Sequence, residues 1–459
     1  MQPAYAAGTH HDGVFNGVNV SYDAAVEAVP VGAATIVATT YVADAPAASR
    51  ARRPVIFIFN GGPISPSIYL HMLALGPKRL AIPDDLSADP ALFALVDNPY
   101  SPLDAADLVF YDPASTGYSR VAPGAKPEQF FSVDADARQL TDFILAWSRQ
   151  HGRTDSPKYL FGESYGTLRA AVSARQLGEG KQPVRLDGVF LMGQALNIVE
   201  TSQRPGNILS YVVSLPTLAA LGWYHGRVPH DGRTFEQFED EVRLYARTDY
   251  MAALFDGGAL APSRAGQVAA RLQSLTGLPA QQFLDKNLRV SKNQFRAQLL
   301  ADQGLALGAN DGRYVAKADA SGRLPDASAR IYPFVFKAFD TYARDELHVR
   351  DAQPYIVDSP TDSWDYGGTA SPFGDWPFMA SIGKAMAAYP RLRIMVGAAY
   401  HDTLTTTGAA DYAVAQSGWP RARVTLNYYQ GGHMFYTSEA SLKKMSADMH
   451  AFIAAGGAQ

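Results

Sequence analysis

The sequence contains no cysteine among its 459 residues. A chain without thiols forms no disulfide, and it offers no thiolate to a zinc site, an iron–sulfur cluster or a covalent mechanism. Neither sign of charge is in excess, because 40 basic residues face 44 acidic ones and the formal net charge is −4. Nucleic acid and anionic lipid both attract clustered basic residues, so the composition instead favours a peptide or a small molecule as the partner.

Long apolar runs are missing as well. No stretch approaches the roughly 18–20 apolar residues that a membrane span requires. Residues 1–30 lack a basic segment followed by an apolar one, so we expect no signal peptide in the chain as given. The sequence is compatible with a cytoplasmic protein that starts at Met1 and with a periplasmic or secreted protein whose leader was removed.

Patterns typical of metal-dependent catalysis are also missing. The sequence has no H-E-x-x-H helix, and His10 and His11 lie in a predicted loop near the terminus. We therefore expect a protein that needs neither a metal nor a cofactor.

Short apolar and β-branched runs that end in turn residues recur along the chain. They cover residues 55–59, 108–111, 159–161, 189–192, 394–396 and 424–429. Continuous runs of this kind suit strands buried in a parallel sheet. Between them, helical patterns include an apolar stripe made by Val133, Ala137, Leu140, Ile144 and Trp147. The alternation predicts an α/β fold with a doubly wound, mostly parallel sheet.

This alternation stops near Asn197 and resumes near Trp376. The segment between them has amphipathic helical patterns at residues 235–245, 264–275 and 294–300. An insertion after a strand of an α/β core is a common place for a lid over the substrate, and a packing appendage without a gating role is the alternative. We predict a first part of the core at 1–199, a helical insertion or lid at 200–370 and a second part of the core at 371–459.

The sequence from Gly162 to Gly166 fits the G-x-S-x-G pattern of a nucleophile on a tight turn between a strand and a helix. Residues 158–161 read as the strand and residues 167–176 as the helix, which is the context that the pattern requires. Ser164 is therefore the predicted nucleophile. The alternative is an inert serine in a glycine-flanked turn.

A serine nucleophile needs a base, which in enzymes with this turn is a histidine near the C-terminus, preceded by an acid. His433 follows the predicted strand 424–429, whereas His450 lies in a predicted final helix. We assign His433 as the base. Asp402 follows the preceding predicted strand and is the expected acid, with Asp411 in reserve.

Two further features lie beside this set. Asn60, Gly61, Gly62 and Pro63 follow the predicted strand 55–59, and a glycine pair there can turn backbone N–H groups toward a developing oxyanion. Glu163 precedes the serine, where a negative charge would oppose an oxyanion. A protonated Glu163 would instead donate a hydrogen bond to a carboxylate of the substrate.

Together these residues resemble the serine carboxypeptidase family, in its bacterial branch. The motifs occur in that family's order, at residues 60–63, 98–101, 117–119, 162–166 and 432–434. The resemblance implies an α/β-hydrolase fold, the triad Ser164, Asp402 and His433, and an oxyanion hole made by the backbone N–H groups of Gly62 and Tyr165.

The same resemblance implies how a peptide is held. Asn60 and Glu163 would bind its C-terminal carboxylate, which favours activity at mildly acidic pH. Tyr69, Leu73 and Met434 would line the pocket for the departing residue, with core packing as an alternative role for Leu73.

Three positions depart from the family's pattern. Ile64 and Ser115 replace glycines, and Ala74 stands where eukaryotic members carry a second carboxylate-binding glutamate. We therefore predict a serine carboxypeptidase and keep two alternatives: an esterase or acyltransferase on the same scaffold, and a non-catalytic binding protein derived from a hydrolase.

Overall fold

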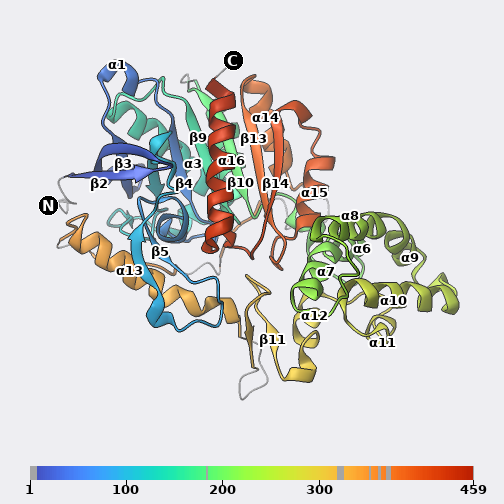
Figure 1. Ribbon diagram of the computed structural model, residues 1–459. Helices are drawn as coiled ribbons and strands as arrows, with labels where there is room; N and C mark the ends of the chain where they lie inside the picture. Colours follow the sequence, from blue (N-terminus) through green and yellow to red (C-terminus); the bar gives the residue numbers. More distant parts are fainter. Residues whose placement is uncertain are drawn as a thin grey trace.

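The computed structural model describes residues 8–181, 184–317, 325–350, 353–359, 363–367 and 374–457. Its centre is a sheet with the strand order β1-β2-β3-β7-β4-β9-β10-β13-β14 (Figure 1). The strands are β1 (Thr9–Phe15), β2 (Val18–Val31), β3 (Ala34–Ala43), β4 (Val55–Phe59), β7 (Asp107–Tyr111), β9 (Lys158–Glu163), β10 (Leu186–Met192), β13 (Arg393–Ala399) and β14 (Val424–Tyr429). From β7 to β14 neighbouring strands are parallel.

The apolar runs of the sequence form these parallel strands, so the predicted strands and the α/β class are confirmed. Every residue of β4, β7, β9 and β10 is buried, as expected for strands covered on both faces. The antiparallel strands β1, β2 and β3 were not predicted. The loop expected at His10 and His11 is wrong, because both residues lie in β1, paired with β2.

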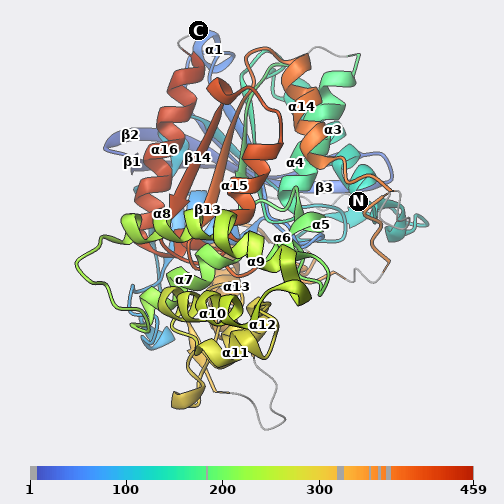
Figure 2. The same ribbon diagram turned by 90° about the vertical axis from the view of Figure 1, so that its right-hand side faces the viewer.

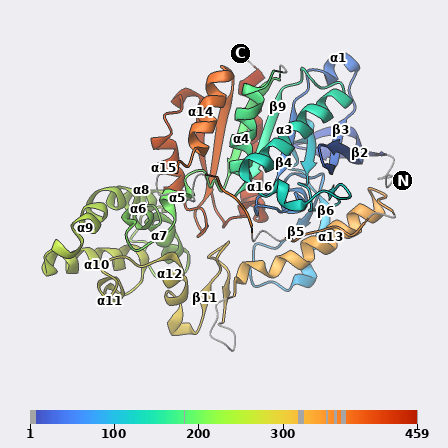
Figure 3. The same cartoon turned by 180° about the vertical axis from the view of Figure 1, so that it is seen from behind.

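Helices cover both faces of the sheet. The first face packs against α3 (Val133–Gln150), α4 (Gly166–Glu179), α14 (Phe378–Ala388) and α15 (Thr407–Gln416), as Figure 3 shows. The opposite face packs against α16 (Glu439–Gly457), which buries Leu442, Met445 and Met449 (Figure 1). This two-sided cover leaves the carboxyl ends of the parallel strands as the edge where loops gather.

Between β10 and β13 the chain leaves the sheet and forms a group of helices with an apolar cluster of its own (Figure 2). They are α5 (Ile198–Thr201), α6 (Ile208–Val212), α7 (Leu215–Tyr224), α8 (Phe235–Tyr245), α9 (Met251–Asp256), α10 (Pro262–Thr276), α11 (Ala280–Leu284) and α12 (Lys292–Gln298). The group lies beyond the carboxyl ends of the strands (Figures 1 and 2). We call it the helical insertion.

The chain then returns through β11 (Ala306–Leu307), β12 (Val315–Ala316) and α13 (Tyr332–Asp345). Helix α13 packs Val335, Phe339 and Tyr342 into the apolar cluster that also contains the buried residues of α16. These side chains do not belong to the apolar cluster of the insertion. The predicted boundary at 370/371 lies outside the described residues. Smaller elements are α1 (Ala47–Arg50), α2 (Ile68–Leu70), β5 (Lys78–Ala81), β6 (Ala94–Asp97) and β8 (Arg120–Val121).

None of the described helices combines the length and the apolar content needed to cross a lipid bilayer.

Helix α3 is anchored to the sheet by one large side chain. Trp147 is fully buried and packs edge-on against Phe57 of β4, with ring centroids 5.6 Å apart. Trp147→Ala should lower the free energy of unfolding by about 3–5 kcal/mol, because a large cavity replaces these contacts. Urea denaturation measures the change. The matched control is Phe255→Ala, whose side chain is 81% exposed and whose loss should change little; equal effects of the two substitutions would contradict the assignment of Trp147 as a core anchor.

Candidate active site

Ser164 lies on the turn between β9 and α4, in a conformation that serine seldom adopts. Its φ is 58°, in the left-handed region. Backbone strain of this kind persists only where the surroundings enforce it. Here the Ser164 N–H donates to the carbonyl of Met192, and its carbonyl accepts from both the N–H and the hydroxyl of Thr167. The turn therefore holds the serine side chain at the carboxyl end of the sheet.

The two glycines of the motif are required by close backbone contacts. A Cβ on Gly162 would lie 2.3 Å from the carbonyl oxygen of Gly166, and a Cβ on Gly166 would lie 2.9 Å from the carbonyl oxygen of Asn60. The spacing G-x-S-x-G thus reflects two places where main chains touch.

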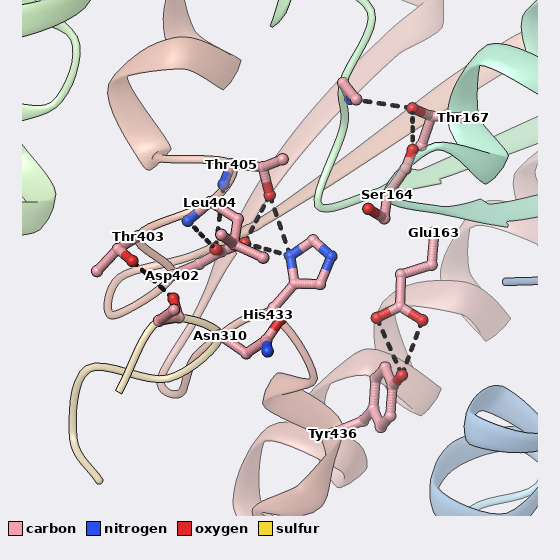
Figure 4. Close-up of polar contacts among 12 residues, drawn as sticks. Glu163, Ser164, Thr167, Asn310, Asp402, Thr403, Leu404, Thr405, His433 and Tyr436 are labelled. Carbon is pink, nitrogen blue, oxygen red and sulfur yellow. Dashed lines mark hydrogen bonds and ion pairs between the residues drawn. The ribbon is translucent and has the colours of Figure 1, made fainter. Parts of the chain in front are cut away.

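His433 and Asp402 meet as the chain order predicted. The Nδ1 of His433 lies 2.7 Å from Oδ2 of Asp402, and both side chains are buried (Figure 4). Thr405 adds a hydroxyl that donates to the same Oδ2 at 2.5 Å, while the N–H groups of Leu404 and Thr405 donate to Oδ1. Burial opposes a charge on His433, but the carboxylate of Asp402 outweighs it and raises the pKa of this histidine.

Ser164 lies on the other side of the imidazole. In Figure 4 its hydroxyl is on the side of Nε2, whereas Asp402 contacts Nδ1. A serine, a histidine and an aspartate in this order correspond to the nucleophile, the base and the acid that the sequence predicts. The reserve acid Asp411 lies elsewhere, bonded to Arg243 and Tyr428.

The loop after β4 passes directly beside the turn. A Cβ on Gly61 would lie 2.6 Å from the backbone nitrogen of Tyr165, and Gly62 has a φ of 109° that favours glycine. Gly62, Ser164 and Tyr165 line one cavity, so the two backbones that the sequence suggested for an oxyanion hole lie at the serine.

Arg169 of α4 holds this loop from behind. Its guanidinium is fully buried and donates to the carbonyls of Asn60 and Pro63 at 2.8 and 2.9 Å. It also forms a 2.7 Å ion pair with Asp136 of α3, which accepts a further bond from the hydroxyl of Tyr165. One cation thus ties the loop to two helices.

Glu163 is a buried carboxyl group next to the serine. The amide of Asn60 donates to its Oε2 at 2.5 Å, and the hydroxyl of Tyr436 lies 3.0 and 2.8 Å from its two oxygens (Figure 4). Burial raises its pKa to about 7, against the lowering effect of His433, Tyr436 and Asn60; the charge of Asp402 raises it further. Near neutral pH this group therefore exchanges between its neutral and charged forms.

Two cavities meet at Ser164. The smaller, of about 260 Å³, is lined by Asn60, Glu163 and His433, together with Tyr69 and Met434. The larger, of about 1090 Å³, extends toward the helical insertion. Leu73 lines neither of these cavities; it is 1% exposed and packs in the core under the sheet, in agreement with the alternative role considered for it.

Ile64, Ala74 and Ser115, which depart from the family's pattern, differ in backbone conformation and burial. Ser115 has a φ of 72°, where glycine is favoured, so serine costs about 1–3 kcal/mol of backbone strain there. Ile64 and Ala74 are buried. The sequence reasoning named no substitute for the absent glutamate at Ala74; Tyr436 is the additional side chain that contacts Glu163.

Comparison with known proteins agrees with this geometry. The family model for the serine carboxypeptidases matches residues 41–205, which include the loop after β4 and the turn that carries Ser164. The chain is a serine hydrolase related to the serine carboxypeptidases. No curated protein sequence matches the hydrolase significantly.

Solved structures share its fold. The structure of Kex1Δp, a prohormone-processing carboxypeptidase from Saccharomyces cerevisiae, matches with a TM-score of 0.51 and 11% identity over 94% of this chain and 91% of that one. A proline iminopeptidase from Mycobacterium smegmatis gives 0.39 and 14% over 94% and 98%. A putative aryl esterase from Burkholderia cenocepacia gives 0.38 and 10% over 95% and 100%. The match to Kex1Δp, whose TM-score is 0.51, confirms the α/β-hydrolase fold.

Sequence reasoning missed three side chains that position the site: Thr405, Tyr436 and Arg169. Thr405 follows Asp402 by three residues, a spacing at which a hydroxyl can reach a carboxylate across a turn, and this signal was available. Tyr436 and Arg169 act on residues far away in the sequence, and no local pattern marks them.

The Arg169–Asp136 pair can be tested by stability. Arg169→Met leaves a buried carboxylate without its cation and should lower the free energy of unfolding by about 3–5 kcal/mol at pH 7. The double variant Asp136→Asn/Arg169→Met removes both charges and should recover part of this loss. Urea unfolding of both proteins measures it, with Arg175→Met, a more exposed arginine on the same helix, as the control. A single variant as stable as that control would refute the role.

Proposed function

We propose that this hydrolase removes C-terminal residues from peptides, through an acyl-enzyme on Ser164, and that mildly acidic pH favours the binding of the peptide's terminal carboxylate. The observation that carries the proposal is Glu163, a carboxyl group beside the serine whose pKa burial raises to about 7. In its neutral form Glu163 can donate a hydrogen bond to the terminal carboxylate of a peptide, with Asn60 beside it. An ester or amide without that carboxylate gains nothing from such a group.

The proposed chemistry begins with attack of the Ser164 hydroxyl oxygen on the last peptide carbonyl. His433 Nε2 accepts the proton, while Asp402 holds Nδ1–H. The oxyanion faces the N–H groups of Gly62 and Tyr165. When the C–N bond breaks, His433 returns the proton to the departing amine. Water activated by the same histidine then hydrolyses the ester and restores the serine.

The departing residue belongs in the smaller cavity, because Asn60 and Glu163 lie there. Tyr69 and Met434 contribute apolar surface to its wall. The acyl part of the peptide must then extend from Ser164 into the larger cavity.

Binding of a peptide acid should weaken as pH rises. The neutral form of Glu163 is populated below its pKa of about 7 and lost above it, and the charged form repels the substrate carboxylate. A substrate that ends in an amide escapes this repulsion. The ratio of kcat/KM for matched acids and amides therefore isolates Glu163 from the titration of His433.

The first experiment uses N-blocked dipeptides, their C-terminal amides and simple esters at pH 5 and pH 8, with products identified by mass spectrometry. We expect release of the free C-terminal amino acid from the acids, with a larger acid-to-amide ratio at pH 5. Ser164→Ala should remain folded, lose turnover and escape labelling by a fluorophosphonate probe.

Other outcomes would select other functions. Ester turnover without peptide cleavage would reject the peptidase and favour an esterase or acyltransferase with a specialised pocket. A wild-type protein that neither turns over substrates nor reacts with the fluorophosphonate would support the remaining alternative, a non-catalytic binding protein derived from a hydrolase.

Tyr436 should set the pH at which peptide binding is lost. Tyr436→Phe removes a donor that favours the charged form of Glu163, so the pKa of Glu163 should rise. The pH at which KM for a peptide acid increases should move up by about one to two units, since a hydrogen bond to a charged group contributes about 1.5–3 kcal/mol. Glu163→Gln, neutral at every pH, should abolish this dependence. KM between pH 5 and pH 9 measures both.

Tyr100→Phe is the matched control. Its hydroxyl donates to Glu439 at 2.8 Å, a carboxylate away from both cavities. This variant should keep the wild-type profile. A Tyr436→Phe profile unchanged or moved to lower pH would contradict the role given to Tyr436.

A further inference from the structure

The larger cavity at Ser164 carries an uneven distribution of charge. Three cationic side chains line it, Arg204, Lys292 and Arg296, and all three come from the helical insertion. The backbone N–H of Lys292 donates to the side chain of Gln203 at 2.7 Å, which ties α12 to the segment that carries Arg204. One wall of the cavity is therefore positively charged.

None of these cations forms an ion pair with another residue that the structure describes. Within the described part of the chain, no carboxylate lies within 4.0 Å of the charged end of Arg204, Lys292 or Arg296. Two of these cations donate to neutral acceptors: Lys292 Nζ donates to the carbonyl of Leu404 at 3.2 Å, and Arg296 donates to the carbonyls of residues 307 and 308 and to the amide oxygen of residue 293. A cation that is partly removed from water and paired only with neutral oxygens is stabilised by an added anion.

Lys292 is connected to the reacting groups through one residue. The carbonyl that it contacts belongs to Leu404, whose own N–H donates to Asp402 at 2.7 Å. Burial lowers the pKa of Lys292, and the charge of Asp402 acts in the opposite direction. Leu404 lines both cavities, so Lys292 stands where the larger one begins.

The same cavity also has two acids, Glu200 and Asp375. Burial and the neighbouring Asp375 raise the pKa of Glu200. Neither acid contributes to the pKa of Lys292, for which Asp402 is the charge that acts. Two acids and three cations thus line this cavity, and Lys292 is the cation joined to the active site through Leu404.

From this arrangement we infer that the residue supplying the reacting carbonyl, the penultimate residue of the peptide, carries an acidic side chain that Lys292 binds, with Arg296 and Arg204 adding to the positive field. The inference rests on the proposed function, because it requires the acyl part of a peptide in the larger cavity. It names a substrate class, peptides with aspartate or glutamate before the last residue.

The test uses N-acetylated dipeptides that share the best-cleaved C-terminal residue and carry Glu, Gln, Leu or Lys before it. At pH 6 wild-type kcat/KM should be about tenfold higher for Glu than for Gln, as expected for one hydrogen bond to a charged group. Lys292→Met should bring the Glu-to-Gln ratio close to one, and Lys292→Arg should keep much of it. Lys286→Met, an exposed lysine of the same insertion, should retain the wild-type ratio.

The outcomes separate two failures. If wild-type enzyme cleaves none of the dipeptides, the proposed function is wrong. If it cleaves them with no preference for Glu over Gln, or if Lys292→Met keeps the preference, the function stands and the inference is wrong. A preference for Lys would also overturn the inference and assign the dominant charge to Glu200 and Asp375.

Discussion

The active site depends on a steric constraint. The loop after β4, the end of β9 and the start of α4 pass so close to one another that a Cβ atom does not fit at their contacts. The loop after β4 touches the turn after β9 at Gly61, and that turn closes on itself between Gly162 and Gly166. This closeness forces Ser164 into a left-handed conformation and sets the loop of Gly62 beside it. Replacement of any of these glycines would move main chain, and the position of the nucleophile with it.

The closeness has an electrostatic consequence. A loop pressed against the sheet buries its polar groups, so they need partners inside the protein. Arg169 satisfies two loop carbonyls, and Asp136 balances its charge. Glu163 is buried in the same layer, and burial outweighs the lowering effect of His433 and of the hydrogen-bond donors on its pKa. The same packing that positions the serine also makes its neighbour a carboxylic acid that titrates near neutral pH.

Sequence reasoning succeeded where function follows from local pattern. The parallel strands are continuous apolar runs, the serine turn has fixed glycine spacing, and His433 and Asp402 follow successive strands. It missed β1 to β3, because the search relied on continuous apolar runs and β2 instead alternates buried and exposed residues. It missed Arg169 and Tyr436 because their partners, at residues 60 and 163, are 109 and 273 positions away. Such contacts exist only once the fold is formed.

The residues around Ser164 come from two parts of the chain, the sheet core and the helical insertion. The serine, the histidine, the aspartate and the buried acid all come from the sheet core, whereas the cations of the larger cavity come from the helical insertion. The insertion has its own apolar cluster, so its cavity-facing side chains can change without repacking the sheet. A scaffold divided in this way can keep one serine site while the charge of the larger cavity changes, and Lys292 is the cation of the insertion that contacts the segment of Asp402, through the carbonyl of Leu404.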